Sequence, residues 1–213
     1  MKICCVGYRK WALDIYKMLS FERFETFLID DYRSYEEKKI IEFDPDYVLF
    51  YGWSWIVSKE LISDYVCVML HPSPLPKYRG GSPLQNQIIN GETESAVTLF
   101  IMDEGIDTGD IIGQQYLSLK GDLNTIFKNI TRIGFSLTMD FLKNGIKRRK
   151  QNHSEATFFK RIKEENSEIS IKDLKTKDGK YLYNKIRMLD DPYPNAFFKT
   201  SDGYKIILFF FEL

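Results

Sequence analysis

The alternation of short apolar runs with helical segments constrains the fold of this chain more than any other feature. Four nearly continuous apolar runs occupy residues 3–7, 24–29, 47–50 and 65–70. Segments with helical spacing or high charge separate them, at residues 11–19, 35–43 and 57–62. Such runs are typical of strands in a parallel sheet whose two faces are covered by helices. The sequence therefore predicts an α/β fold with a Rossmann-like, mostly parallel sheet and helices on both faces.

The rest of the chain continues this pattern and then becomes more polar. Further helices and strands are expected at residues 82–90, with Ser82 as N-cap, and at residues 95–102, 111–118 and 122–144. A basic stretch at residues 147–153 predicts a domain edge, so that residues 1–150 form the main domain and residues 151–213 a small C-terminal α+β region. There we expect a helix at residues 181–189 and a hairpin of residues 195–200 with 204–211.

The composition limits the classes of protein to which the chain can belong. Its hydrophobic content of 44% excludes a disordered chain. Thirty Lys and Arg balance thirty Asp and Glu, so the net charge provides no long-range attraction to nucleic acid or to an anionic membrane. No apolar run approaches the roughly eighteen residues of a membrane helix. Arg9 and Lys10 stand where a secretory signal has its apolar core, and the three cysteines form no CxxC pair, so we expect a cytoplasmic protein with reduced thiols.

A stiff, irregular loop follows the fourth apolar run. Four of the seven prolines lie between residues 72 and 83, together with Gly80 and Gly81. Proline fixes φ and glycine permits close backbone approach. Ligands of such sheets bind beyond the carboxyl ends of the strands, where this loop presents the side chains of His71, Ser73, Lys77, Tyr78 and Arg79. The position predicts a site, although a lone histidine is more often structural.

Several stretches, taken in order, resemble the folate-dependent formyltransferase family. They are residues 71–80 (HPSPLPKYRG), 82–85 (SPLQ), 97–98 (VT) and 102–110 (MDEGIDTGD). Weaker similarity covers residues 53–61 and 184–198. Asp107 alone, in a glycine-containing loop, is more often a turn former. The resemblance implies the formyltransferase fold and places His71 and Asp107 on the family's catalytic histidine and aspartate.

The resemblance also implies a reaction, in which a formyl group passes from N10-formyltetrahydrofolate to a primary amine. The amine must lose a proton, and an oxyanion develops on the formyl oxygen. His71 suits proton transfer at neutral pH, and Asp107 would orient it. Neither a metal nor a covalent nucleophile is required. The residues implied on the folate side are Trp53, Trp55, Ile56, Asp103, Gly105, Ile106, Gly109 and Asp110.

Two positions depart from the family pattern. The family's third catalytic residue is an asparagine two positions before the histidine, and Met69 stands there. Methionine cannot donate a hydrogen bond, so either another group substitutes or the enzyme is slow. Asn86 is the candidate donor, with an ordinary helix-surface amide as the alternative. Ser54 stands where the family's folate loop usually has glycine, with Gly52 two residues earlier.

The tail resembles that of the nucleotide-sugar N-formyltransferases, at residues 158–161 and 167–169. This resemblance implies an acceptor such as a UDP- or dTDP-linked 4-amino-4,6-dideoxy sugar, used for a bacterial surface glycan, and a C-terminal region that helps to bind it. The residues expected to bind it are Ser73, Lys77, Tyr78, Arg79, Gly81, Arg161, Arg187 and Tyr193. For the residues of the tail, a solvated face over a small aromatic core is the alternative.

Other functions stay open at the level of sequence. A glycinamide ribonucleotide-type formyltransferase is the alternative enzyme. Loss of the asparagine at Met69 also permits a catalytically inactive protein that binds folate or a nucleotide sugar. We expect neither a nucleic-acid partner nor a membrane, and a homodimer is one of the assembly states left open.

Overall fold

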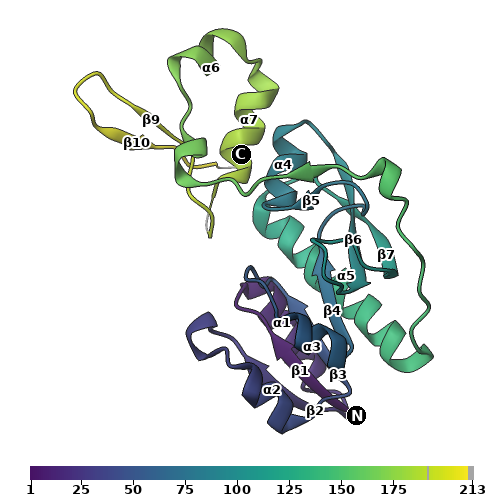
Figure 1. Ribbon diagram of the computed structural model, residues 1–213. Helices are drawn as coiled ribbons and strands as arrows, with labels where there is room; N and C mark the ends of the chain where they lie inside the picture. The colour runs from purple at the N-terminus through teal and green to yellow at the C-terminus, as the bar shows by residue number, and fades with distance from the viewer. Residues whose placement is uncertain (191, 211–213) are drawn as a thin grey trace.

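A six-stranded mixed sheet forms the centre of the protein, as the computed structural model shows for residues 1–190 and 192–210 (Figure 1). Its strands are β1 (Lys2–Val6), β2 (Glu25–Ile29), β3 (Tyr47–Tyr51), β4 (Cys67–His71), β6 (Glu94–Ile101) and β7 (Ile111–Ser118), in the order β2-β1-β3-β4-β6-β7. The first four strands are parallel, and β6 and β7 are antiparallel to their neighbours. This architecture confirms the predicted fold class.

Helices cover both faces of the sheet because the central strands β1, β3 and β4 are apolar on both sides. On one face, α1 (Lys10–Leu19) and α5 (Leu123–Asn144) bury Ile15 and Ile130 against Tyr51 and Leu70. On the other, α2 (Glu37–Phe43) and α3 (Lys59–Asp64) pack on Phe50 and its neighbours. The free cysteines lie in these layers, and burial raises the pKa of both Cys4 and Cys67 to about 12, which makes them inert thiols.

Side chains cap α5 and α3, whereas a third helix begins without such a bond. Asp122 accepts a hydrogen bond from Thr125 N at 2.7 Å and so caps α5. Ser58 caps α3 in the same way through Leu61 N. Ser82 occupies the predicted N-cap position of α4 (Pro83–Ile89), but its side chain makes no capping bond, because the residue adopts a left-handed φ of 50° and its hydroxyl accepts a hydrogen bond from Ile162 N.

The chain after residue 162 forms a small cluster of its own beside α4. It contains α6 (Ile171–Thr176), α7 (Gly179–Met188), β9 (Phe197–Lys199) and β10 (Lys205–Ile207), with a short 3-10 helix at Glu164–Ser167. In Figure 1, α6 and the β9–β10 hairpin lie away from the sheet. Buried Ile169, Leu189 and Ala196 form a separate core there. The hairpin confirms the expected pairing, although residue 211 of the predicted strand lies outside the described residues.

The segment of residues 151–162, hereafter the return segment, connects the two parts and passes back along the proline-rich loop. Its β8 (Phe158–Phe159) pairs in parallel with β5 (Arg79–Gly80), and a 3-10 helix at His153–Glu155 precedes β8. The predicted division after residue 150 stays a prediction. The return segment makes its contacts with the proline-rich loop and the Asp107 loop of the main domain. A third 3-10 helix, Tyr32–Ser34, follows β2. No helix of the described part of the chain has the length and apolarity to cross a membrane.

The hydroxyl of Tyr16, on α1, ties together the ends of β1 and β3. It lies 2.9 Å from Val6 O and 2.8 Å from Leu49 O, and it accepts a hydrogen bond from Tyr51 N at 2.8 Å. An added Cβ on Gly7 would lie 1.9 Å from Tyr51 O, so the chains pass too closely for any side chain. This contact fixes the strand ends from which the site residues project.

We expect Tyr16→Phe to lower the free energy of unfolding by about 1–3 kcal/mol, because Tyr51 N–H would be buried without an acceptor. Urea denaturation measures this change. Tyr204→Phe removes an exposed hydroxyl from the hairpin and should leave the stability unchanged. Equal stability of Tyr16→Phe and the wild type would contradict the role given to this hydroxyl.

Candidate active site

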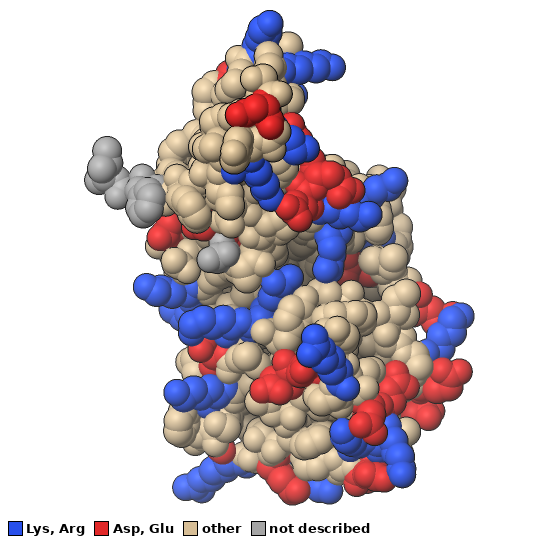
Figure 2. Space-filling view, turned by 90° about the vertical axis from the view of Figure 1, so that its left-hand side faces the viewer, with Lys and Arg blue, Asp and Glu red and all other residues tan. Residues whose placement is uncertain are grey.

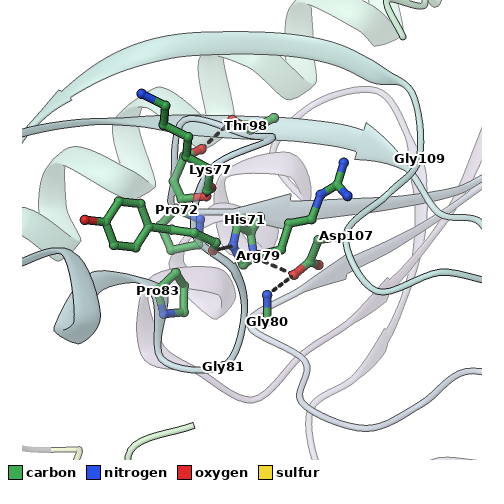
Figure 3. A network of polar contacts seen from close by, with 12 residues as sticks. His71, Pro72, Lys77, Arg79, Gly80, Gly81, Pro83, Thr98, Asp107 and Gly109 are labelled. Atoms are coloured by element: carbon green, nitrogen blue, oxygen red, sulfur yellow. Dashed lines mark hydrogen bonds and ion pairs between the residues drawn. The ribbon is translucent and has the colours of Figure 1, made fainter. Parts of the chain in front are cut away.

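His71 lies at the carboxyl end of β4 with both ring nitrogens directed at fixed groups (Figure 3). Its Nε2 is 2.8 Å from Tyr78 O, and because a carbonyl only accepts, Nε2 carries the proton. In the neutral ring Nδ1 therefore holds the lone pair, and it lies 3.6 Å from Asp107 Oδ2. The ring is 5% exposed, so its orientation is set by these contacts. A proton taken up at Nδ1 would face a carboxylate.

Asp107 is held in place by the backbone of the proline-rich loop. Its Oδ2 accepts a hydrogen bond from Gly80 N at 2.8 Å, and the residue is 8% exposed. Its φ is 54°, in the left-handed region that few side chains adopt. Tyr78 and Ser82 share this conformation, with φ of 59° and 50°. Such strained residues persist only where the surroundings fix them, and they gather at functional sites.

Gln151 joins the Asp107 loop to the proline-rich loop. Its Nε2 donates to Asp107 O at 3.0 Å and to Gly109 O at 2.8 Å. Its Oε1 accepts from Arg79 Nε at 3.3 Å and from Arg79 Nη2 at 2.6 Å. Because a guanidinium only donates, the amide cannot be reversed. Sequence reasoning missed Gln151, which lies in a polar run with no periodicity, and it missed His153, whose Nδ1 lies 3.2 Å from Arg79 Nη2.

The return segment fixes the far side of the proline-rich loop. Thr157 O accepts a hydrogen bond from Arg79 N at 2.9 Å, and Thr157 Oγ1 accepts one from Tyr78 N at 2.8 Å. Phe159 O accepts one from Gly81 N at 2.9 Å. These bonds run along the residues that contact His71 and Asp107. The loop is therefore held from both sides, and the geometry of the site depends on residues after 150.

Four residues expected to bind the acceptor are used inside the protein, which corrects those predictions. Ser73 is fully buried and donates to Lys77 O, and Arg79 is 6% exposed and bound to Gln151. Tyr78 stacks on Phe159 and donates to Glu92 Oε1, and burial, with this bond to Glu92, raises its pKa. Arg187 is 6% exposed and donates to Leu119 O and Gly121 O, which ties α7 to the loop before α5.

The other four expected acceptor residues keep accessible positions. Lys77 is exposed, with its Nζ directed away from the His71–Asp107 pair in Figure 3. Arg161 is exposed and Tyr193 half-buried. Gly81 lies against Arg161, so closely that an added Cβ would be 2.4 Å from Arg161 N. Their binding roles stay predictions.

The structure contradicts the assignment of Asn86 as the missing oxyanion donor. Its Nδ2 lies 2.9 Å from Gly81 O, 3.1 Å from Ser82 O and 3.2 Å from Lys160 O. An amide has two protons, and these three carbonyls occupy them. Asn86 therefore closes the turn before α4 and joins it to the return segment.

Met69 lies on β4 two residues before His71, on the same face of the strand. It is half-buried and packs with Met102 beside the apolar cluster of Leu75, Phe100 and Ile111. A thioether there supplies no proton, so the strand presents an apolar surface where the family pattern has an amide.

The expected folate-side residues come together from two loops beyond β3 and β6. Lys59 Nζ, at the start of α3, pairs with Glu104 Oε2 at 2.5 Å and so brings the two loops side by side. Trp53 is buried, whereas Trp55 and Ile56 are 42% and 96% exposed. Ser54 Oγ is 2.8 Å from Tyr8 OH, which gives the unusual serine a partner. The indole N–H of Trp53 has no hydrogen-bond partner among the described residues, an orphaned buried donor on this side of the site.

The Asp103–Asp110 loop is shaped by its own short contacts. Asp103 Oδ1 accepts hydrogen bonds from Gly105 N at 3.1 Å and from Thr108 Oγ1 at 2.5 Å. An added Cβ on Gly109 would lie 1.7 Å from Ile101 O, so only glycine fits there. Ile106 is 60% exposed and Asp110 half-buried. The loop thus exposes an apolar side chain beside closely packed backbone, and its folate-binding role stays a prediction.

Comparisons with known proteins identify the family of this chain. The family model described as formyl transferase matches residues 21–126. A solved methionyl-tRNA formyltransferase from Clostridium thermocellum is 35% identical, with a TM-score of 0.86, and the match covers 94% of this chain and 88% of that one. The chain belongs to the formyl transferase family.

Two further proteins resemble this chain, one with a longer chain and one of similar length. A methionyl-tRNA formyltransferase from Lysinibacillus sphaericus (strain C3-41) is 35% identical over 80% of this chain and 55% of its own. The chain thus spans about half the length of the curated relatives it matches. A solved 4-N formyltransferase from Francisella tularensis is 21% identical, with a TM-score of 0.78, and the match covers 98% of this chain and 96% of that one. This second likeness shows the shared fold.

We expect Gln151→Leu to lower kcat for formyl transfer about 100-fold, because a misplacement of catalytic groups by roughly 1 Å has this effect. The change removes the bonds from Gln151 Nε2 to Asp107 O and to Gly109 O, and steady-state kinetics with circular dichroism would measure it. Gln115→Leu changes an exposed side chain on β7 and should leave kcat unchanged. A folded Gln151→Leu enzyme with wild-type kcat would show that Asp107 is positioned without it.

Proposed function

We propose that this protein transfers a formyl group from N10-formyltetrahydrofolate to the amine of a nucleotide-linked amino sugar, of the UDP- or dTDP-4-amino-4,6-dideoxy type. The observation that carries the formyl-transfer part of the proposal is the His71–Asp107 pair, and the choice of a small acceptor is argued from the charge distribution below. Its two members come from separate strand ends and are fixed by Tyr78 O, Gly80 N and Gln151. Family membership supports the formyl-transfer reaction.

His71 and Asp107 would handle the proton of the acceptor amine. As the amine nitrogen bonds to the formyl carbon, the proton it loses passes to His71 Nδ1, the unprotonated nitrogen of the neutral ring. The resulting imidazolium faces Asp107 Oδ2 at 3.6 Å. The same proton is then available to the departing folate nitrogen, which returns the ring to its starting state.

The loops beyond β3 and β6 fit the folate that this reaction requires. When bound, N10-formyltetrahydrofolate supplies the formyl group that is transferred. Trp55 and Ile56 offer exposed apolar surface, and Trp53 Nε1 offers an unpartnered donor in the described structure. Ile106 and the Gly109 backbone form the facing side. Aromatic faces with a few directed polar groups are typical of sites for such heterocycles.

The charge distribution supports a small acceptor over an RNA. On the face in Figure 2, Lys and Arg are interspersed with Asp and Glu. Several exposed lysines are paired with carboxylates, as in Lys10–Asp14, Lys39–Glu36 and Lys205–Glu164. RNA binding depends on a basic surface that contacts many phosphates. The charges seen here fit a ligand with a local anionic group.

Formylation of methionyl-tRNA is the second candidate function. It is favoured by the 35% identity to relatives that carry this name. The two candidates differ in the acceptor and share the His71–Asp107 chemistry, so the acceptor must be tested directly.

The acceptor test supplies N10-formyltetrahydrofolate with one amine at a time. The panel is a UDP-linked and a dTDP-linked 4-amino sugar, glycinamide ribonucleotide and methionyl-tRNA, with the product followed by mass spectrometry. We expect formylation of a nucleotide-linked amino sugar alone, and its loss in His71→Asn. Formyl-methionyl-tRNA as the sole product would replace this proposal by the second candidate. Formylation of glycinamide ribonucleotide alone would also overturn it.

We expect Met69→Asn to raise kcat, by a factor of roughly 100 to 1,000, because it supplies one oxyanion donor. The variant places an amide on the face of β4 that carries His71. Its thermal stability must be measured, since Met69 packs among apolar side chains. Met18→Asn, on the exposed side of α1, is the matched control. An unchanged kcat in folded Met69→Asn would show that another group already serves the oxyanion.

A further inference from the structure

The turn after β1 meets the chain after α7 at a seam between the sheet and the C-terminal cluster. The guanidinium of Arg9 lies there between two aromatic rings, 4.8 Å from the ring centroid of Tyr8 and 5.1 Å from that of Tyr193. Figure 2 shows Lys and Arg side chains gathered at the waist between the upper and lower parts of the protein. The rings hold Arg9 in one orientation and leave its N–H groups free to bind a ligand.

Two cations at this seam have no anionic partner in the described residues. Arg9 is half-buried and forms neither a hydrogen bond nor an ion pair through its guanidinium. Arg161 is likewise without a side-chain partner, and its backbone is fixed against Gly81, as the close approach to an added Cβ there shows. A half-buried arginine without a carboxylate is unusual, because its desolvated charge is normally paired. An anion bound here would neutralise the charges of Arg9 and Arg161.

A buried donor without a partner points to the same place. Gln85, on α4, is 1% exposed, and its Nε2 has no hydrogen bond of good geometry in the part of the chain that the structure describes, although its amide approaches the Tyr193 hydroxyl. Burial raises the pKa of Tyr193, and the Gln85 amide and the charges of Arg9 and Arg161 act to lower it. The packing agrees with this, because Arg9 contacts the Tyr193 ring, α4 packs on α7, and the backbone on both sides of Arg161 is bound to the start of α4 through Lys160 O and Ile162 N.

The N-terminus of α1 adds to the positive electrostatic potential at the seam. Arg9 is the N-cap residue of this ten-residue helix, its side chain makes no capping bond, and the first turn has no acidic residue. The helix begins at the carboxyl end of β1, between β2 and β3, where α/β sheets form their crevice. The helix dipole favours an anion at this position.

We propose that Arg9, Arg161, Gln85 and Tyr193 bind the diphosphate of the acceptor. The inference rests on the proposed function and deepens it by placing the nucleotide half of the ligand. Two guanidinium groups match two phosphates, and each can donate in pairs. Arg161 adjoins Gly81, next to Gly80, whose N–H binds Asp107, so a sugar extending from the diphosphate would reach the His71–Asp107 pair.

Contacts of Tyr8 and Arg9 join the turn after β1 both to the folate-side loop and to the C-terminal cluster. Tyr8 OH is 2.8 Å from Ser54 Oγ in the folate-side loop, while its ring supports Arg9. Arg9 and Tyr193 thereby connect the folate side with the C-terminal cluster. An anion bound between Arg9 and Arg161 would order both sides of the acceptor site together.

The test measures binding of UDP, dTDP and inorganic pyrophosphate by isothermal titration calorimetry. The variants are Arg9→Gln, Arg161→Gln and Gln85→Leu, with Arg23→Gln, an exposed arginine elsewhere, as the control of equal charge change. We expect each of the first three to weaken diphosphate binding about 10-fold or more, as loss of a hydrogen bond to a charged group does. Arg23→Gln should bind as the wild type does, and circular dichroism checks that every variant is folded.

The outcomes separate this inference from the proposed function. Formylation of a nucleotide-linked amino sugar with unchanged KM in Arg9→Gln and Arg161→Gln would overturn the inference and keep the function. Pyrophosphate binding that depends on both arginines, in a protein that formylates no nucleotide sugar, would keep the anion site and overturn the function. Loss of tRNA binding in the same variants, with no binding of UDP or dTDP, would identify the phosphates as those of RNA and overturn the diphosphate assignment.

Discussion

The hydrogen bonds of the Gln151 side-chain amide hold together the two loops from which the rest of the site is built. The amide donates to the backbone on one side and accepts from Arg79 on the other, so each of its hydrogen-bonding groups is used. A buried network of this kind is stable only when all members are satisfied. Asp107 can keep its left-handed backbone because Gln151 and Gly80 bind it. The ring of His71 is oriented by Tyr78 O, and Asp107 is thereby held opposite its Nδ1.

The return segment gives the proline-rich loop a second boundary. Proline stiffens the loop locally, but it cannot decide where the loop lies relative to Asp107. Backbone hydrogen bonds from Thr157 and Phe159 do this, and Asn86 and Ser82 add side-chain bonds to the same segment. The polar residues of the loop are therefore largely used to build the site. The exposed polar groups at its edge are Lys77 and Arg161, whereas His71 and Asp107 are buried beneath the loop.

The family pattern combines a proton-handling pair with an oxyanion donor, and with Met69 this chain has the first without the usual second. The proton-handling pair is present with defined geometry, whereas the amide that would stabilise the oxyanion is replaced by an apolar side chain. Electrostatic stabilisation of developing charge is commonly the largest contribution to such catalysis. Under the proposed function, the His71–Asp107 pair would still handle the proton, and the rate of the chemical step would depend on what donates to the formyl oxygen.

The sequence by itself determined the order of strands and helices and the placement of His71 and Asp107 at strand ends, because apolar periodicity and turn residues are local signals. It could not determine which polar side chains reach the site. Ser73, Tyr78, Arg79 and Arg187 have suitable chemistry but bond inside the protein, while Gln151 and Arg9 came from unremarkable stretches. These outcomes depend on partners far away in the chain, such as the pairing of residues 79–80 with 158–159. Only tertiary packing decides which donors and acceptors meet, since each buried polar group must find a partner wherever the fold places one.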